Sequence, residues 1–216
     1  MKKLIITTII LLSISYVFSQ GSERNNASFS LGDGISFSFN EGDYEFNIYG
    51  FIKPTYIFND EKIYTADGEY SNVFRQFKSQ NSNLFFTGFA KDEKLSFTIQ
   101  MDYSSSNPLV EAFIGYHFNE KTKLYFGQMR VNHNNLEMTY NEDRLRFTNR
   151  GILSQTYTDN GEEFGLFFET SLGKLIIFKP TLAITSGDGK NSFGDDSWDS
   201  DKGGVKFGSR INIFPF

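Results

Sequence analysis

The residues of this sequence that could do chemistry are charged side chains placed at alternate positions of apolar segments. The basic ones are Lys53, Arg130, Lys179, Lys206 and Arg210. Basic side chains that line a water-filled passage favour anions, because rings of one charge sign select the ions that pass. The alternate positions opposite the apolar side chains also hold five carboxylates: Glu45, Asp102, Glu111, Glu163 and Glu169. Since the two sets balance, the sequence favours a weakly selective passage over a phosphate-selective one.

The long connection 132–162 is the segment best placed to narrow such a passage. It contains Arg144, Arg146 and Arg150, and also Glu137, Glu142, Asp143 and Asp159. The candidate pore-lining residues are therefore Lys53, Arg130, Arg150, Lys179 and Arg210. The alternative for each of them is that it pairs with a neighbouring carboxylate and braces the interior.

Other chemistry is sparsely represented. The chain has no Cys. A barrel hydrolase needs a His beside a nucleophile at the outer rim, but His117 lies two residues from a predicted periplasmic turn, at the wrong end, and His133 has no Ser close in sequence. Aspartates crowd the segment 188–201, but their spacing does not match an EF-hand calcium loop. We therefore expect no enzymatic activity, no catalytic residues, no cofactor and no metal site. The 26 acidic residues exceed the 21 basic ones, which argues against a nucleic-acid partner.

The beginning of the chain is typical of an export signal. Lys2 and Lys3 precede an apolar run, Leu4 to Phe18, that ends at the small residue Ser19. We expect cleavage after Ser19. The predicted organisation is then a signal peptide at 1–19, an N-terminal periplasmic segment at 20–43 and a β-barrel at 44–216.

The segments that would position the charged residues alternate with a period of two. In the clearest, 94–104, Leu95, Phe97 and Ile99 alternate with polar side chains, which predicts a strand with one apolar face. In 124–131, we assign Tyr125 to the apolar face and Phe126 to the opposite one. The eight predicted strands are 44–58, 83–90, 94–104, 110–118, 124–131, 163–169, 176–185 and 205–213. Phe51, Phe113, Phe126 and Phe167 are expected to face inward.

The connections between these strands alternate in length. Tight turns are expected at 91–93, 119–122 and 172–173, whereas 59–81, 132–162 and 185–202 are long. Transmembrane barrels have short turns on the periplasmic side and long loops outside. The 25 Phe residues would then be lipid-facing and interfacial rings. We predict an all-β fold, an antiparallel transmembrane β-barrel of about 8 strands; a soluble sandwich or lipocalin-like barrel is the alternative.

Three stretches of the sequence resemble the phosphate-selective porin O and P family of outer-membrane porins. They are 49–54, 124–131 together with Leu136, Glu137, Asn149 and Arg150, and 204–216. The resemblance implies a sixteen-stranded trimeric barrel, with a loop folded into the lumen and basic residues along an anion path. Asn132 stands where the family usually has Pro. Family members are about twice as long, so the chain would correspond to their N-terminal half.

The expected function is passive diffusion of small hydrophilic solutes across the cell outer membrane, with anions such as phosphate as the narrower possibility. The expected partners are outer-membrane lipid, these solutes and, through the resemblance, two further copies in a homotrimer. The alternative is a closed eight-stranded barrel with a structural or adhesive role and no open pore, because an eight-stranded lumen is barely wide enough for side chains.

Overall fold

The structure is a computed structural model that describes residues 25–90, 92–134, 139–141, 144–145, 151–156, 161–174, 176–187, 189 and 204–215. The predicted signal peptide at 1–19, most of the aspartate-rich segment 188–201 and Arg150 lie outside the described residues. Among the described residues, no helix has the length and apolar character needed to cross a membrane.

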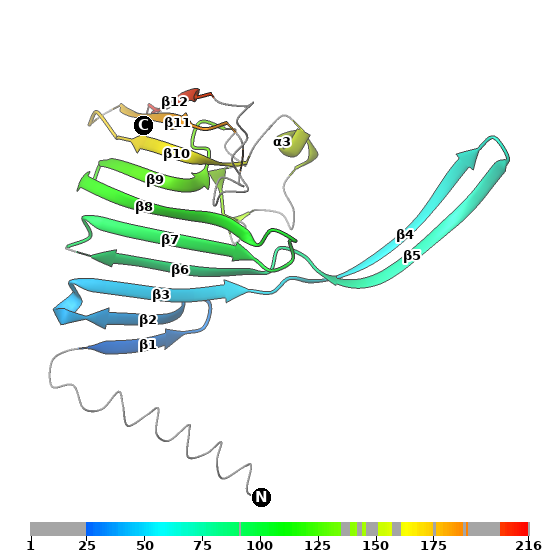
Figure 1. The fold of residues 1–216 in the computed structure, drawn as a ribbon, viewed down its shortest axis with the longest axis horizontal. Helices are drawn as coiled ribbons and strands as arrows, with labels where there is room; N and C mark the ends of the chain where they lie inside the picture. The colour runs from blue at the N-terminus through cyan, green and yellow to red at the C-terminus, as the bar shows by residue number, and fades with distance from the viewer. Residues whose placement is uncertain are drawn as a thin grey trace, which may run out of the picture.

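The described residues form twelve strands and two short helical segments (Figure 1). The strands are β1 (Asn26–Ser30), β2 (Gly34–Phe39), β3 (Tyr44–Phe51), β4 (Pro54–Thr65), β5 (Gly68–Ser79), β6 (Asn83–Ala90), β7 (Leu95–Asp102), β8 (Leu109–Asn119), β9 (Thr122–Arg130), β10 (Glu162–Glu169), β11 (Ile177–Thr185) and β12 (Lys206–Phe214). The helical segments are the 3-10 helix η1 (Asn40–Gly42) and α3 (Ile152–Thr156).

Ten strands form one antiparallel sheet in the order β1-β2-β3-β6-β7-β8-β9-β10-β11-β12. Every neighbour in space is also the next strand along the chain, apart from the insertion between β3 and β6. Within the described residues, β1 and β12 each pair on one side only, so the sheet does not close on itself. The all-β antiparallel prediction is confirmed.

Seven of the eight predicted strands correspond to single strands, β6 to β12, with ends shifted by a few residues at most. The eighth, 44–58, is wrong as one strand: it divides into β3 and β4, because β3 pairs with β6 whereas β4 pairs with β5. Strands β1 and β2 precede the predicted barrel and extend the sheet beyond β3. The chain therefore has more strands than the sequence indicated.

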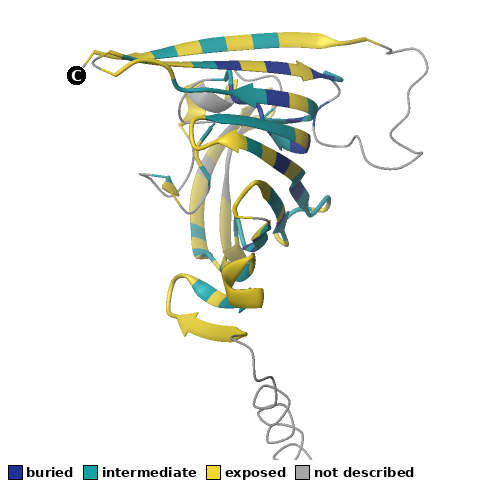
Figure 2. Ribbon diagram, turned by 90° about the vertical axis from the view of Figure 1, so that its left-hand side faces the viewer, coloured by how far each residue is buried: buried dark blue, intermediate teal, exposed yellow. Residues whose placement is uncertain are grey.

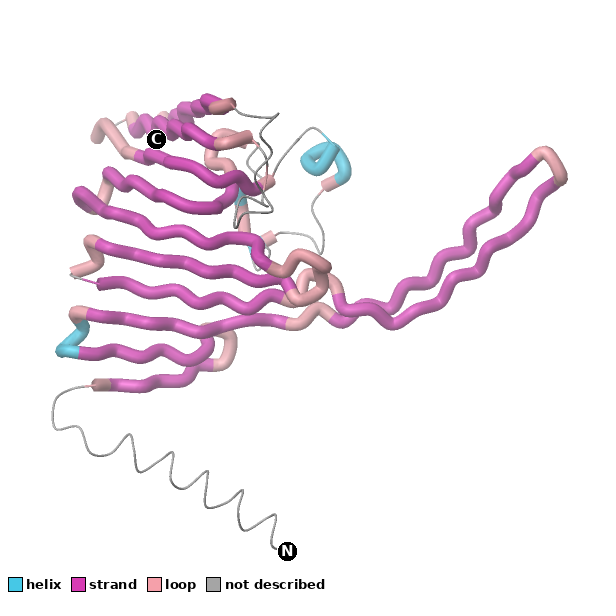
Figure 3. Tube along the Cα trace, in the orientation of Figure 1, coloured by secondary structure: helices cyan, strands magenta, loops and turns pink. Residues whose placement is uncertain are grey.

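Strands β4 and β5 form a separate two-stranded ribbon that projects away from the sheet (Figures 1 and 3). It occupies most of the connection that we predicted as the long loop 59–81. The long connections, 131–161 and 186–205, leave the sheet at the same edge as this hairpin. The opposite edge holds short turns, and the turn between β6 and β7 places Asp92 and Glu93 at φ of 54° and 62°, as tight hairpins require.

The two faces of the sheet differ in polarity, and the apolar face is the exposed one. Ile114, Leu182 and Phe207 are 62%, 51% and 75% exposed, whereas Gln100, Glu163 and Asn83 are 0%, 0% and 3% exposed. Figure 2 shows the sheet curving, with exposed and buried residues alternating along its strands. A water-soluble sheet buries its apolar face, so this polarity is the reverse of a soluble one.

In β9, the sequence analysis assigned two residues to the wrong faces. Phe126 pairs with Leu166 and Ile114 and is exposed on the apolar face, where its ring lies 5.3 Å from that of Phe164. Tyr125 lies on the opposite face, 5.6 Å from the ring of Phe113. Both faces of this stretch carry apolar residues, so the period of two does not show which face is the apolar one. The pairing of β9 with β8 and β10 determines the face on which each residue lies.

Candidate solute cavity

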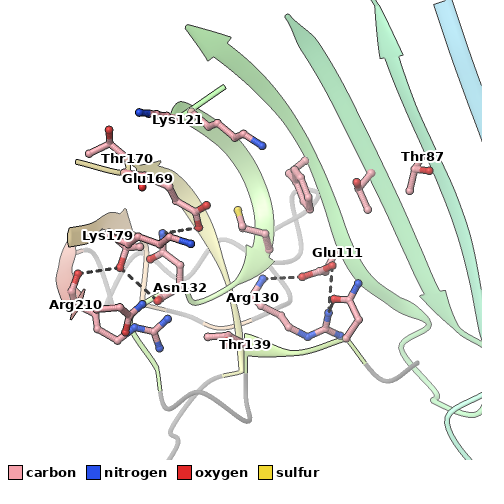
Figure 4. A pocket seen from close by; sticks show the side chains of 18 of the residues that line it. Thr87, Glu111, Lys121, Arg130, Asn132, Thr139, Glu169, Thr170, Lys179 and Arg210 are labelled. Carbon is pink, nitrogen blue, oxygen red and sulfur yellow. Dashed lines mark hydrogen bonds and ion pairs between the residues drawn. The ribbon is translucent and has the colours of Figure 1, made fainter. Parts of the chain in front are cut away.

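The concave face of the sheet holds an open cavity of about 750 Å³. The wall of the cavity is formed by residues from β3 and from β6 to β12, together with residues from two turns and from the connection after β9 (Figure 4). The charged lining residues are Lys121, Lys123, Arg130, Lys179, Arg210, Glu111, Glu120 and Glu169. Cavities of this size accommodate small organic molecules.

The structure brings together three of the five candidate pore-lining residues. Arg130, Lys179 and Arg210 line the cavity from β9, β11 and β12. Lys53 lies in the link between β3 and β4, where its backbone carbonyl accepts a hydrogen bond from the Gln80 amide at 3.0 Å, and it does not line the cavity. Arg150 lies outside the described residues.

Arg130 is held in a buried network of polar side chains. Its guanidinium lies 3.4 Å from Glu111 and 3.8 Å from Glu162, and donates to the Gln100 side-chain oxygen at 3.3 Å. Its backbone amide donates to Glu111 at 2.9 Å. Arg130 is 4% exposed. Its charge is therefore largely neutralised, so it braces β7, β8 and β9 more than it attracts a solute.

A second ion pair, in which only the carboxylate is buried, lies near the start of β10, at the edge of the sheet from which the long connections leave. The Glu163 carboxylate accepts hydrogen bonds from Lys206 at 2.8 Å and from the Thr185 hydroxyl. Lys206 is partly exposed while Glu163 is fully buried. Lys206 thus supplies a positive charge that offsets part of the cost of burying the Glu163 carboxylate.

The first residues after β9 fold back over the inner face of β10, β11 and β12. The Asn132 amide donates to Glu169 at 3.4 Å, and the Asn132 carbonyl accepts from the Thr181 hydroxyl at 3.4 Å. Arg210 donates to the Asn134 carbonyl. Val131 and Asn132 are both buried. The beginning of this long connection is therefore part of the interior and partly fills the concave side.

His133 lies in the same folded-back segment, over Gly208. Burial lowers the pKa of His133 below its usual value, and the positive charge of Lys206 lowers it further; Glu163 acts in the opposite direction and Arg210 adds to the lowering. The neutral imidazole is therefore the form that fits this position. Its Nδ1 atom is buried without a hydrogen-bond partner among the described residues.

Four of the basic lining residues, Lys121, Lys123, Lys179 and Arg210, form no ion pair with a carboxylate of the described chain. Lys179 lies 5.0 Å from the centre of the Phe214 ring. The lining as a whole has five basic and three acidic side chains, which differs from the balance predicted from the sequence. Lys121 and Lys123 were missed because Lys121 lies in the turn between β8 and β9 and Lys123 lies at the start of β9, before the predicted strand 124–131.

A serine and a histidine also meet on the inner face. The Ser96 hydroxyl lies 3.0 Å from His117 Nε2, which pairs residues from β7 and β8 that are far apart in sequence. In the described part of the chain, no carboxylate hydrogen-bonds the other nitrogen of this ring, so the third member of a hydrolytic triad is missing there. The described residues also hold no cluster of three His, Cys, Asp or Glu side chains that could bind a metal ion.

The sequence matches no protein-family model, and no curated protein is significantly similar to it. The resemblance to the phosphate-selective porin O and P family therefore stays a prediction. What this protein does has to be inferred from the sheet and its cavity.

Proposed function

We propose that this chain forms the wall of an outer-membrane, porin-type channel through which small hydrophilic solutes diffuse. The observation that carries the proposal is the reversed polarity of the sheet. Large apolar side chains project from the convex face, while amides, carboxylates and basic groups, interspersed with aromatic rings such as Phe85 and Phe113, line the cavity on the concave face. Transmembrane barrels have this arrangement, apolar toward lipid and polar toward the lumen.

The free energy of the exposed face supports a lipid environment. Each large apolar side chain gains about 1.5–3 kcal/mol when it moves from water to an apolar surrounding. The sheet exposes many of them on one face, among them Ile99, Ile114, Leu166, Leu182, Phe207 and Ile211. Such a continuous apolar surface is unfavourable in water and favourable in a bilayer.

The arrangement of the connections supports a transmembrane sheet and indicates which of its edges faces outward. The hairpin β4–β5 and the long connections leave one edge of the sheet, and short turns close the other (Figure 3). In bacterial outer-membrane barrels the short turns face the periplasm. We therefore place the β4–β5 hairpin, and the edge of the sheet from which it projects, toward the outer side of the membrane, with the predicted export signal directing the chain to that membrane.

The charge of the cavity favours anions among the solutes. Two more basic than acidic side chains line it, and Glu111 already neutralises Arg130. The remaining cations give a positive potential where a solute would pass, which raises the local anion concentration. The charges of the described residues support a general preference for anions. Phosphate in particular is suggested only by the family resemblance.

The test is conductance of the purified chain in a planar lipid bilayer, with the reversal potential measured in a salt gradient. We expect discrete openings and a modest preference for anions over cations. Lys179→Glu should shift the reversal potential toward cations, and Lys62→Glu, in the projecting hairpin, is the matched control and should not. Complete silence from folded, inserted protein would contradict the channel.

A plugged barrel with a structural or adhesive role is the second candidate, and one observation favours it. The segment 131–134 packs against the inner face of β10 to β12 and takes up space on the concave side. Under this alternative, the bilayer experiment gives stably inserted protein without openings, and deletion of the hairpin β4–β5 alters cell-surface binding.

A further inference from the structure

A second, smaller cavity lies on the concave face, at the β1 end of the sheet. It has a volume of about 270 Å³, and its wall comes from β1, β2, β3 and β6. It shares Thr87 with the larger cavity, and Figure 4 shows Thr87 on the side away from Lys179 and Arg210. The small cavity is therefore separate from these two cations.

The side chains that line the small cavity form two rows across the four strands. Each row has one residue from each strand, paired with the next across the sheet. The first row is Asn26, Ser38, Glu45 and Phe89, and the second is Ser28, Ser36, Asn47 and Thr87. Directly opposite residues of an antiparallel pair have β-carbons about 4.5–5.5 Å apart. Neighbouring groups in these rows are therefore close enough to contact one small molecule together.

Small side chains produce the hollow between β1 and β3. Ser36 and Ser38 on β2 extend by a single oxygen beyond the β-carbon, whereas Glu45 and Asn47 on β3 are longer. The sheet curves toward this face (Figure 2), which brings the groups on neighbouring strands toward one another. The result is a shallow site with a serine floor and longer polar groups beside it.

The polar groups of the small cavity are almost all uncharged. The two rows hold four hydroxyls, two amides and one carboxylate, and no basic side chain lines the cavity. Within the described part of the chain, Asn47 Oδ1 is buried without a hydrogen-bond partner, and the Glu45 carboxylate forms no ion pair. Both are acceptors, so they fit a ligand that donates hydrogen bonds. A ligand with several hydroxyls does this, whereas an anion would be repelled by Glu45.

An aromatic ring lies at the β6 end of the first row. Phe89 lines the cavity, is 39% exposed, and is held edge-on against His117 at 6.2 Å and 72°. The face of an aromatic ring is negative, so the weakly positive C–H groups of a sugar ring pack favourably on it. Hydroxyls and C–H groups on one ring would thus match the two kinds of lining group in this cavity.

We infer that the small cavity is a binding site for a neutral sugar ring, with Glu45 and Asn47 accepting hydrogen bonds from its hydroxyls and Phe89 packing against its C–H groups. The volume lies just below the range of about 300–1,000 Å³ that drug-sized ligands occupy, so the site takes one monosaccharide. The inference goes beyond the proposed function, because it assigns a second site to an uncharged ligand and requires no open channel.

The test is equilibrium dialysis of the full chain against glucose, galactose and mannose, in an amine-oxide detergent because sugar-headed detergents would compete. The uronate of the tightest sugar, which is the same ring with a carboxylate, is then used to displace the bound sugar. We expect at least one sugar to bind and its uronate to displace it about tenfold less effectively, since Glu45 repels the second carboxylate. Displacement by the uronate at equal concentration, or no binding of any of the three sugars, would overturn the inference.

Two conservative variants assign the binding to this cavity. Ser36→Val fills the hollow with methyl groups on a strand that tolerates them, and should weaken sugar binding at least tenfold. Glu45→Gln should weaken it about three- to tenfold and remove the discrimination against the uronate. Ser209→Val on the convex face and Asp92→Asn in the turn after β6 are the matched controls and should change neither. Unchanged binding in folded Ser36→Val and Glu45→Gln protein would overturn the assignment.

Conductance measured with the same protein separates this inference from the proposed function. Sugar binding that depends on Ser36 and Glu45, without channel openings, supports the site and contradicts the channel. Anion-preferring openings in a protein that binds none of the three sugars support the channel and overturn the inference.

Discussion

His133 lies directly over Gly208, so that a β-carbon at position 208 would overlap the imidazole ring. This contact joins the connection after β9 to the last strand of the sheet, two parts of the chain that are remote in sequence. A glycine is thus needed at position 208 because the His133 ring occupies the space of a β-carbon. His133 in turn helps to hold the connection against the inner face of the sheet.

Gly208→Ala should displace His133 and destabilise the fold by about 1–3 kcal/mol, the usual cost of overpacking a filled site. The measurement is urea unfolding of the protein in detergent, followed by circular dichroism. Ser209→Ala, one residue further and on the opposite face, is the control and should have little effect. If Gly208→Ala combined with His133→Ala is no more stable than Gly208→Ala alone, the contact is not the cause.

Stability should fall as the solution is acidified below the usual pKa of histidine, about 6.5. The pKa of His133 is lowered in the folded protein, so between the two pKa values the unfolded chain binds more protons. Stability from this group is therefore present above pH 6.5 and is lost as pH falls through the folded pKa. Unfolding free energies of wild type and His133→Gln from pH 5 to 8 test this, and identical pH profiles would refute the role of His133.

Lys206→Met should destabilise the protein by about 1–3 kcal/mol, because it removes a cation that compensates the fully buried Glu163 carboxylate. In a Glu163→Gln background, the same substitution should lower the free energy of unfolding much less, because no buried carboxylate then loses its cation. Lys179→Met, which removes a lysine without an ion pair in the described residues, is the control. Equal costs in both backgrounds would show that Lys206 and Glu163 are not coupled.

Leu182→Arg should reduce the stability of the membrane-inserted protein by about 2–4 kcal/mol, the cost of placing arginine on the lipid-facing side of a barrel. Leu182 is about half exposed on β11, so in water the same substitution would be nearly neutral. Tyr64→Arg, in the projecting hairpin, is the exposed control and should be tolerated. The measurement is heat-dependent migration of the folded protein in gels.

Much of the sheet could be predicted because its strands separate apolar from polar residues. The alternation of Leu95, Phe97 and Ile99 with polar neighbours defines β7 without reference to any other strand. The hairpin β4–β5 lacks this signal, because beyond Phe58 both of its faces meet solvent and polar residues such as Asn59 and Asp60 follow one another. The sequence therefore predicted only a long connection at 59–81, and neither the pairing of β4 with β5 nor the start of the hairpin at Pro54 was predicted.

The cavity could be predicted in part. Lys179 and Arg210 follow from alternation in β11 and β12. Arg130 shares its alternate positions with Phe126, which lies on the apolar face, so alternation in β9 does not predict its place in the cavity. The pairing of Arg130 with Glu111 depends on the register between β8 and β9, which the sequence does not specify. Of the aromatic rings that line the cavity, Phe113 was predicted to face inward because it lies among the polar positions of its strand. The stacking of Tyr49 on Phe85 was not predicted, because it depends on the pairing of β3 with β6 across the inserted hairpin.

The central claim is that the convex face lies in lipid and the concave face surrounds a solute path. The chain contains no cysteine, so single cysteines can be introduced at Leu182 and Phe207 on the convex face, and at Lys179 and Asn212 on the concave face. The most direct test is the reaction of these variants, inserted in lipid vesicles, with a membrane-impermeant thiol reagent. We predict that the Lys179 and Asn212 positions react and the Leu182 and Phe207 positions are protected. Equal reaction at all four positions, or the reverse pattern, would contradict the account.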